Sequence, residues 1–388
     1  MNPFNEIINR RNTQSIKWDV EENELPMWVA DMDFKTAPAV QKAIMDRAAS
    51  GVYGYTAPFD DWFEAYLSFY KDRHDLTLKK EWLMFSTGVV PTISSSVRAF
   101  TDEGDEVLLL TPVYNIFFNS ILNNHRIAKE VPLIRDGDAY QIDFKTLEEA
   151  ASSPKAKLLI FCNPGNPISR IWTKDEIAQV GKICVKHGLI ILSDEIHGEL
   201  TRPGTSYIPF LKACPEAASN LLMAVSPTKS FNLAGIQSSA IIAPSEAVYK
   251  KINRQINADE VAEPNVFSCV AAVAALNEGR EWLDELRKYL FVNRDFVSEY
   301  LASNVPMVRL LPGDATYLLW IDVSKVSEDD ALLADFIRKE TGLFLSKGSV
   351  YGEGGKGFLR MNVACPRQTL IDGLLRFKEG IARFLAQK

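Results

Sequence analysis

Residues 158–194 read LLIFCNPGNPISRIWTKDEIAQVGKICVKHGLIILSD, and this stretch contains the pattern that decides the fold. Its two apolar runs, 158–161 and 189–192, are short and bounded by polar or turn residues, which is typical of strands buried on both faces. Between them, residues 173–187 have the pattern of a helix with Thr173 as its N-cap. A strand, a crossover helix and a second strand form the repeating unit of a parallel sheet.

The same kind of pattern extends on both sides of this stretch. Further apolar runs of four or five residues lie at 107–110 (VLLL), 221–225 (LLMAV) and 240–243 (AIIA). Because such runs alternate with helical patterns from about residue 82 to residue 243, we predict an α/β fold: a mostly parallel sheet with helices on both faces.

The C-terminal part of the sequence has a different texture. We expect helices over 280–303, 327–340 and 366–385, and strands over 316–321 and 357–363. This series lacks a matching set of parallel strands and therefore predicts a smaller α+β domain. The N-terminal segment also lies outside the central series. We expect a large domain over 46–279 and a discontinuous small domain formed by 1–45 and 280–388.

Composition and charge exclude several classes of protein. At about 150 residues per domain, 388 residues suggest two or three domains. The 43 basic and 50 acidic residues give a net charge of -7, which argues against a general nucleic-acid binder. No apolar run approaches the ~20 residues of a membrane span, and we see no secretory signal pattern. Five cysteines without a CxxC motif favour free thiols in a reducing cytoplasm, and the four histidines are not spaced as a metal pair.

Two polar turns directly follow apolar runs. SDEIHGE at 193–199 places Asp194 at the carboxyl end of a predicted strand, where a buried carboxylate needs a cationic or hydrogen-bonding partner. A protonated pyridine nitrogen would be such a partner, and His197 could face the same site. SPTKSFNLAG at 226–235 places Ser226 and Thr228 beside Lys229. Hydroxyls can hold a phosphate, and a partly desolvated lysine can form a Schiff base with a carbonyl.

Two further turns have the same position relative to predicted strands. NPGNP at 163–167 is a rigid, non-helical turn that would fix the Asn166 side chain toward an oxygen. STGVV at 86–90 precedes a helical pattern, and a helix start attracts phosphate. Each of the four turns alone is typical of a surface loop or a structural turn. Together they supply a phosphate cradle, a carboxylate, an amide and a lysine at one edge of a sheet, which are the parts needed to hold pyridoxal 5′-phosphate.

Residues 352–357, GEGGKG, match the dinucleotide-binding pattern G-x-G-x-x-G by letter. That pattern needs a strand before the glycines and a helix after them, whereas here a strand-like run follows. We therefore interpret GEGGKG as a surface loop and not as a nicotinamide site.

Eight strings of residues make the chain resemble a known family. It resembles the fold-type I pyridoxal-phosphate enzymes of the class I/II aminotransferase superfamily, and within it the cystathionine β-lyase-like C–S lyases. The strings are PMWVADMDF (26–34), YGYT (53–56), STGVVPTI (86–93), TPVYNIFF (111–118), NPGNP (163–167), SDEIHGE (193–199), TKSFNLAG (228–235) and RMNVACPR (360–367).

The resemblance implies a role for individual residues. Lys229 would bind the cofactor as a Schiff base and later move the Cα proton, and Asp194 would pair with the pyridinium nitrogen. Tyr114 would stack on the ring. Asn166 would donate to the phenolic oxygen, near His197, which stands where many aminotransferases have a tyrosine.

The resemblance also implies the surroundings of the phosphate and of the substrate. The residues around the phosphate would be Gly88, Val89, Val90, Ser226 and Thr228. Tyr55 would reach the phosphate of a partner subunit, which implies a homodimer. Lys229 and Tyr55 are the two candidates to protonate the leaving thiolate. Arg360 would grip the substrate carboxylate, and Ala30 would lie near the substrate through its backbone.

The implied function is α,β-elimination on L-cystathionine or a related L-cysteine S-conjugate, giving a thiol such as homocysteine, pyruvate and ammonia. An aminotransferase on the same scaffold and a non-catalytic regulatory protein that binds the cofactor are the alternatives. The chain departs from the family pattern at Gln237, where many members have an arginine. It also departs at Gly165 and Ser169, where the lyases often have histidine and glycine.

Overall fold

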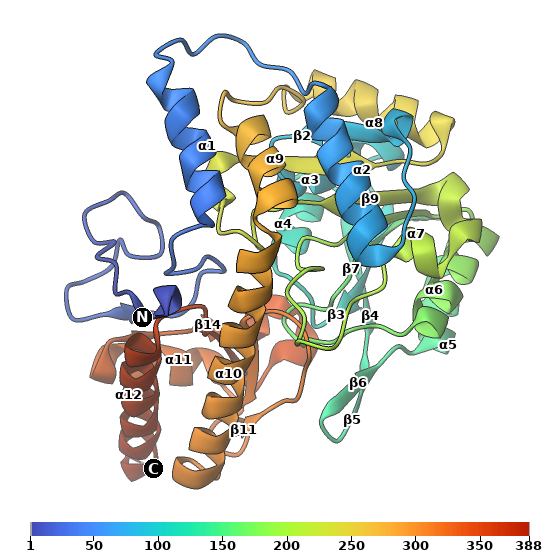
Figure 1. Cartoon of the computed structure of the whole chain (residues 1–388). Helices are drawn as coiled ribbons and strands as arrows, with labels where there is room; N and C mark the ends of the chain where they lie inside the picture. Colours follow the sequence, from blue (N-terminus) through green and yellow to red (C-terminus); the bar gives the residue numbers. More distant parts are fainter. Residues whose placement is uncertain (1, 388) are drawn as a thin grey trace.

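A seven-stranded sheet runs through the larger part of the computed structural model, which describes residues 2–387 (Figure 1). The strands lie in the order β2 (Leu83–Ser86), β10 (Ser239–Ile242), β9 (Leu221–Val225), β8 (Ile190–Asp194), β7 (Ala156–Cys162), β3 (Glu106–Thr111) and β4 (Ile127–Pro132). Only β10 is antiparallel to its neighbours; the other pairs are parallel. The predicted α/β fold with a mostly parallel sheet is therefore confirmed.

Each central strand buries both of its faces. In β7, Leu158 and Ile160 join one apolar core, whereas Leu159 and Phe161 join the core on the opposite face. The first core is formed with α3 (Val89–Phe100), α4 (Ile116–Leu122) and α8 (Glu246–Ala258). The opposite core is formed with α2 (Asp60–His74), α5 (Phe144–Ala151), α6 (Lys174–Lys186), α7 (Phe210–Ala213) and α9 (Ser268–Glu278). This double burial explains why the strands read as continuous apolar runs.

The crossover helix between β7 and β8 begins as the sequence predicts. The Thr173 hydroxyl accepts a hydrogen bond from the Glu176 N–H at 3.2 Å, and the Glu176 carboxylate accepts from the Thr173 N–H at 2.9 Å. This reciprocal capping box satisfies two donors that a helix start leaves unpaired.

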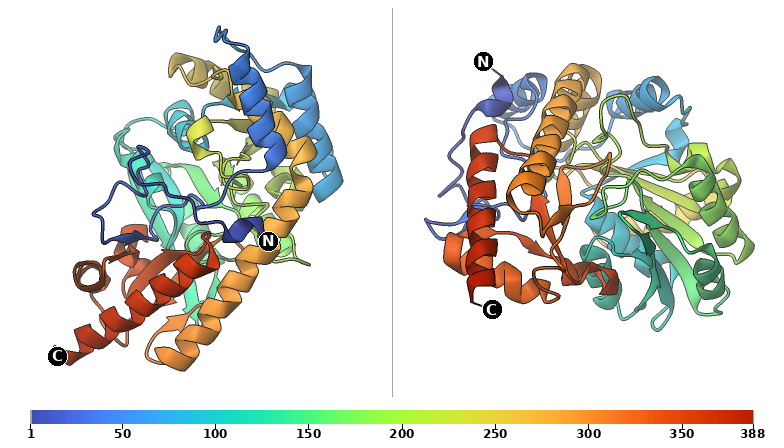
Figure 2. Two further views of the ribbon diagram at one scale, coloured as in Figure 1. Left: turned by 60° about the vertical axis from the view of Figure 1, so that its left-hand side comes forward. Right: turned by 90° about the horizontal axis from the view of Figure 1, so that it is seen from below.

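A second, antiparallel sheet forms the C-terminal part of the molecule, shown in orange and red beside the large sheet (Figure 2). Its strands are β11 (Arg309–Leu310), β12 (Leu318–Asp322), β15 (Phe358–Asn362) and β14 (Ser346–Lys347). With α11 (Asp330–Thr341) and α12 (Arg367–Ala386), it encloses an apolar core of its own. A strand also follows the GEGGKG glycines, as predicted.

The long helix α10 (Arg280–Asn304) connects the two parts. Its first half packs in the core of the large sheet through Leu283 and Leu286, and its second half packs in the C-terminal core through Val297 and Leu301. The N-terminal segment is divided in the same way, because Met27 packs in the C-terminal core while Met32 and Phe34 pack against the large sheet. The domain boundaries at 45/46 and 279/280 stay a prediction.

The other elements are short or peripheral. The helix α1 (Pro38–Ala49) lies near α9, and β1 (Leu25–Pro26) pairs with β13 (Leu343–Phe344), while β5 (Ile134–Asp136) and β6 (Ala139–Gln141) form a separate hairpin. The 3-10 helices are Pro3–Asn5, Lys80–Trp82, Pro215–Asn220, Ala234–Ile236, Gly348–Tyr351 and Glu353–Gly355. Within residues 2–387, no helix combines the length and the apolar character that a bilayer crossing requires.

Candidate active site

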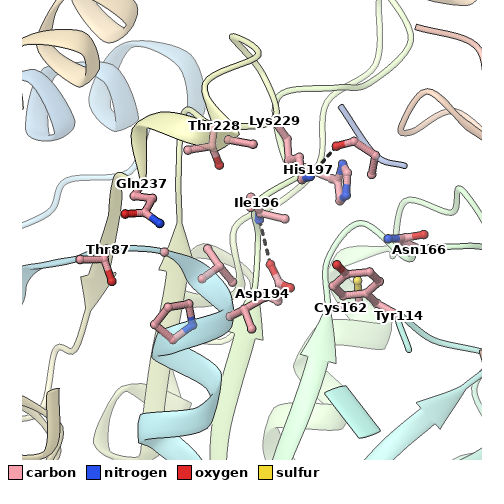
Figure 3. A pocket seen from close by; sticks show the side chains of 16 residues that line it. Thr87, Tyr114, Cys162, Asn166, Asp194, Ile196, His197, Thr228, Lys229 and Gln237 are labelled. Atoms are coloured by element: carbon pink, nitrogen blue, oxygen red, sulfur yellow. Dashed lines mark hydrogen bonds between the residues drawn. The ribbon is translucent and has the colours of Figure 1, made fainter. Parts of the chain in front are cut away.

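A cavity of about 260 Å³ opens where β7, β8 and β9 end and α3 begins. Figure 3 shows side chains from these separate elements turned toward one space. Ten residues predicted from the sequence line it: Ala30, Gly88, Val89, Val90, Tyr114, Asn166, Asp194, His197, Thr228 and Lys229. The carboxyl edge of an open α/β sheet is where ligands bind, and the structure brings the four predicted turns together there.

Lys229 enters the cavity from the turn after β9. Its ammonium group donates a hydrogen bond of 2.5 Å to the Ala30 carbonyl oxygen, and within residues 2–387 it forms no ion pair (Figure 3). Burial lowers the pKa of Lys229 to about 8; Asp31 and Asp194 oppose this effect, and Arg360 adds to it. A lysine with this pKa has an appreciable fraction of free amine near neutral pH, which a nucleophile or a general base needs.

Asp194 is the last residue of β8 and is buried. Its carboxylate accepts the Ile196 N–H at 3.1 Å and has no ion-pair partner within the described chain. Burial raises the pKa of Asp194 to about 6, while the Ile196 hydrogen bond and the charge of Lys229 lower it. A buried carboxylate with one neutral donor leaves room for a further cationic donor.

Arg360 comes from β15 in the other sheet and adjoins the cavity through Asn166. One guanidinium nitrogen donates to the Asn166 side-chain oxygen at 3.3 Å, and another donates to the Trp28 carbonyl at 2.9 Å. The third nitrogen, Nε, is buried without a partner in the described part of the chain. Arg360 is thus a buried cation without a carboxylate partner among residues 2–387, a state that is costly unless a ligand supplies the anion.

His197 lines the cavity as a neutral ring. Burial lowers its pKa to about 3, and the charges of Lys229 and Arg360 act in the same direction. Its Nδ1 is buried and unpartnered in the described residues, and its ring meets Tyr317 edge-on with centroids 6.1 Å apart. At neutral pH this imidazole can take part in hydrogen bonding without carrying charge.

The start of α3 provides free N–H groups at the opposite end of the cavity. Gly88 precedes the helix and no side chain caps it, so the orphan donors of the first turn remain for a ligand. Thr228 lies at the same end, and its hydroxyl is 2.7 Å from that of Ser226. Ser226 does not line the cavity itself; its hydroxyl donates to the Ser238 carbonyl and accepts the Thr228 N–H. Gln237, at the position where the resemblance implies an arginine, also lines this end.

Tyr55 lies outside the cavity of its own chain. It belongs to the segment between α1 and α2, at the top of Figure 1, and its side chain is fully exposed. Val52, Tyr53 and Phe59 in the same segment are also exposed. This position agrees with the expectation that Tyr55 acts on another subunit, which stays a prediction.

The sequence reasoning missed several residues of the site. Cys162 and Ile196 line the cavity beside Asp194, and Cys162 stands opposite Asp194 in the pairing of β7 with β8. The sequence did contain a signal for Cys162, because the apolar run 158–161 ends directly before this residue. Tyr317 had no such signal, since it directly precedes β12 of the other sheet, 88 residues after Lys229 by their numbers.

Comparisons with known proteins agree over nearly the whole length of the chain. Residues 23–377 match the family model of aminotransferase class I and II. Cystathionine beta-lyase PatB from Bacillus subtilis (strain 168) is 37% identical over 385 residues, covering 98% of this chain and 100% of that protein.

Two solved structures have the same fold over the same extent. Cystalysin from Treponema denticola, which contains a pyridoxal 5′-phosphate cofactor, superposes with a TM-score of 0.95 and is 31% identical; 98% of each chain is covered. The pyridoxal-phosphate-bound C–S lyase from Staphylococcus hominis has a TM-score of 0.93 and is 33% identical, with 97% of each chain covered.

Proposed function

The chain belongs to the family of class I and II aminotransferases, and on this premise we propose that it is a pyridoxal 5′-phosphate-dependent carbon–sulfur β-lyase. Its substrate is a small amino acid, L-cystathionine or a related L-cysteine S-conjugate. With one water molecule, α,β-elimination gives a thiol, which is homocysteine for L-cystathionine, together with pyruvate and ammonia. The observation that carries the proposal is the pair of groups at the sheet edge, the half-buried Lys229 and the buried Asp194, in a chain whose relatives are named for this reaction.

The residues of the cavity fit the cofactor. Asp194 is buried without a cationic partner among residues 2–387, as a carboxylate that meets a protonated ring nitrogen would be. Free N–H groups of α3 and the Thr228 hydroxyl suit a phosphate at the other end. Tyr114 provides an aromatic face, and Figure 3 shows the nitrogen of the Asn166 amide turned toward the cavity. When bound, pyridoxal 5′-phosphate supplies an aldehyde for an amine and a ring that takes up the electron pair left on the substrate Cα.

Arg360 holds and orients the substrate. Its guanidinium is already fixed by Asn166 and the Trp28 carbonyl, so little conformational freedom is lost when it pairs with a carboxylate. The buried Nε has an unused hydrogen, and a carboxylate accepts hydrogen bonds in the bidentate geometry that a guanidinium offers. The α-carboxylate thereby fixes the Cα–H bond relative to Lys229.

Lys229 moves the proton at Cα. As a free amine it takes the proton from Cα, and as an ammonium group it holds that proton at Nζ. Its pKa of about 8 lies near neutral pH, which suits both steps. Asp194 would keep the ring nitrogen of the bound cofactor protonated by accepting its hydrogen bond, and His197, which lines the same cavity, stays neutral.

We assign the working form of the protein to a homodimer. The exposed apolar side chains of Val52, Tyr53, Tyr55 and Phe59 stand on one connecting segment, as a surface covered by a second copy would. Tyr55 of one copy would then reach the phosphate end of the other copy's cavity and is the candidate acid for the leaving thiolate. The cytoplasm stays the predicted compartment, in keeping with five cysteines that are buried and free.

One incubation tests the proposed function. The holoprotein is mixed with L-cystathionine, and pyruvate and free thiol are measured with and without 2-oxoglutarate. Without the keto acid, we expect pyruvate and free thiol to form in equal amounts. The Lys229→Ala variant should form neither product. Turnover that requires 2-oxoglutarate would identify an aminotransferase. Cofactor binding without turnover of any amino acid would favour a regulatory protein.

A further inference from the structure

The Ala30 carbonyl oxygen accepts two hydrogen bonds from distant parts of the chain. One comes from the Lys229 ammonium group at 2.5 Å, and the other comes from the Tyr317 hydroxyl at 3.1 Å. No other donor to this oxygen occurs within residues 2–387. A carbonyl oxygen has two lone pairs, so these two donors satisfy it completely.

Tyr317 is fixed in this position by its surroundings. It directly precedes β12, is 1% exposed, and its backbone oxygen accepts the Val363 N–H from the end of β15. Burial raises the pKa of Tyr317 far above its usual value, so its hydroxyl is a donor over the whole working pH range.

The segment that carries Ala30 is held on both sides of this residue. The side-chain nitrogen of Asn362 donates to the carbonyls of Val29 and Asp31, each at 2.6 Å. Asn232, in the turn after Lys229, accepts the Met32 N–H at 3.0 Å and donates to the Met32 carbonyl. The Ala30 oxygen therefore cannot easily turn away to seek another donor.

Lys229 has to leave this oxygen during the reaction. A lysine that bonds to an aldehyde carbon or reaches the substrate Cα cannot keep its hydrogen bond to Ala30. Without Tyr317, the departure of Lys229 would leave a buried carbonyl without a protein donor, which is unfavourable. With Tyr317 present, the carbonyl keeps the hydrogen bond from the Tyr317 hydroxyl whether Lys229 is bound to it or has moved away.

We propose that Tyr317 is a positioning residue that lets the Lys229 amine leave the Ala30 carbonyl, by keeping that carbonyl hydrogen-bonded when the lysine moves away. The inference rests on the proposed function, because it takes Lys229 to be the amine that reacts with the cofactor. It assigns a role to a side chain that does not line the cavity itself.

The isosteric variant Tyr317→Phe tests this role. In the variant, Ala30 has only Lys229 as a donor and holds the ammonium form more firmly, so the pKa of Lys229 should rise. The groups that face Lys229, namely Asp31, Asp194, Arg360 and His197, are unchanged. The measurement is the rate at which cofactor-free, full-length protein binds pyridoxal 5′-phosphate covalently between about pH 6 and about pH 9. The Lys229 amine attacks the aldehyde carbon, a C=N bond forms and one water leaves; absorbance follows the reaction, and borohydride trapping with mass spectrometry locates it.

We expect the midpoint of this pH dependence to be about one pH unit higher in Tyr317→Phe than in the wild type. At pH values below the midpoints of the two proteins, the variant should react roughly tenfold more slowly. Tyr140→Phe is the matched control, because it also deletes the hydroxyl of a buried tyrosine with one hydrogen bond, here accepted from the Trp320 indole N–H at 3.2 Å. The control should keep the wild-type midpoint.

Four other outcomes are possible: three overturn the inference, and one overturns the proposed function. An unchanged midpoint in Tyr317→Phe overturns the inference, and so does a rate loss that is equal at all pH values. A lower melting temperature without a shifted midpoint also overturns it, since that is what a purely structural hydroxyl would give. Wild-type protein that forms no bond between Lys229 and the cofactor would overturn the proposed function itself.

Discussion

Three charged side chains meet around the cavity, two buried and one half-buried, and each lacks an ion-pair partner in the described part of the chain. Asp194, Lys229 and Arg360 have instead one or two neutral hydrogen-bond partners. Buried charges of this kind reduce stability unless a ligand pairs with them. Asp194 and Arg360 match a ring cation and a substrate carboxylate in charge, and the Lys229 amine matches an electrophilic carbonyl. The three side chains together therefore indicate the function more strongly than any one motif does.

The guanidinium geometry of Arg360 leads to the first prediction. Arg360→Lys keeps the positive charge but removes the planar pair of donors, so we expect kcat/KM for L-cystathionine to fall about 10- to 100-fold, mainly through KM. Steady-state kinetics measures the change. Arg383→Lys is the control, because Arg383 forms exposed ion pairs with Glu340 and Glu379 far along α12 and should leave kcat/KM unchanged. A wild-type KM in Arg360→Lys would remove Arg360 from the substrate site.

The raised pKa of Asp194 predicts a conflict between stability and activity. Burial raises the pKa of Asp194 from 3.8 to about 6 in the folded protein. The ionised carboxylate therefore lowers the free energy of unfolding by its full amount above about pH 6, and this loss is absent below pH 3.8. Asp194→Asn should therefore stabilise the cofactor-free protein by about 1–3 kcal/mol at pH 8, and this gain should vanish near pH 3.8. The same substitution should reduce kcat at least about 100-fold, because the ring nitrogen loses its carboxylate.

Denaturant unfolding of the cofactor-free protein at several pH values measures the first effect, and pyruvate release by the holoprotein measures the second. Equal unfolding free energies of the two proteins at pH 8 would contradict the assignment of a buried, ionised Asp194.

The same residues show what the sequence could predict about the site. Lys229 and Asp194 each follow a short apolar run, so their position at a sheet edge could be predicted from local pattern alone. Tyr317 and Asn232 act through backbone carbonyls of the segment around Ala30. No local pattern reports which carbonyl a distant side chain will meet, because that contact depends on how the two sheets pack.

Among the elements, those with a strong period were predicted within a few residues. The helix after Thr173 runs from Lys174 to Lys186, and the terminal helix runs from Arg367 to Ala386. The edge strand β4 (Ile127–Pro132) was not predicted: only Val131 in it is buried, and it ends on a proline. An edge strand that packs little apolar surface lacks the continuous run by which the central strands were recognised.

The turn after β7 explains two departures from the family pattern. Ser169 adopts φ 56°, a conformation that favours glycine, but its hydroxyl donates to the Leu318 carbonyl at 2.7 Å and so ties the turn to β12. Gly165 leaves space that Ile168 fills, because a Cβ at this position would lie 2.8 Å from the Ile168 Cγ1. The turn is thus packed around a glycine and a polar serine, and Asn166 lines the cavity.

This packing gives the third prediction. Gly165→Ala should reduce the free energy of unfolding by about 1–3 kcal/mol, because the added methyl group has to displace the buried Ile168 side chain. Denaturant unfolding measures the loss. Gly235→Ala is the matched control: nothing lies within 4 Å of its Cβ position, and it should unfold as the wild type does. If Gly165→Ala had wild-type stability, Ile168 could move freely, and the turn would also accept larger residues.

At the scale of the whole molecule, the site depends on both parts of the chain. The central sheet supplies Asp194 and Lys229, the N-terminal segment supplies Ala30, and the C-terminal sheet supplies Arg360 and Tyr317. The arrangement of the cavity therefore depends on how the two parts pack. Composition and local sequence patterns do not determine that packing. The exposed segment between α1 and α2 would add a second dependence under the proposed homodimer, in which Tyr55 reaches the cavity of another copy of the chain.

Mixing two inactive variants tests that dependence on a second copy. If each site combines Lys229 of one subunit with Tyr55 of the other, Lys229→Ala and Tyr55→Ala chains should complement each other. In a mixed dimer, one site would receive both intact residues and the other site would receive neither. Random pairing makes half of the dimers mixed, so roughly one quarter of the wild-type lyase activity should appear.

The measurement is pyruvate release after the two chains are co-expressed and purified together, compared with each variant alone. A mixture of Lys229→Ala with the Asp194→Asn variant is the control, because both changes lie in the same cavity of the same chain. In that mixed dimer each site keeps one defect, so no activity should return. Equal recovery in both mixtures, or in neither, would contradict a site completed by Tyr55, since only residues drawn from opposite subunits can be restored by pairing.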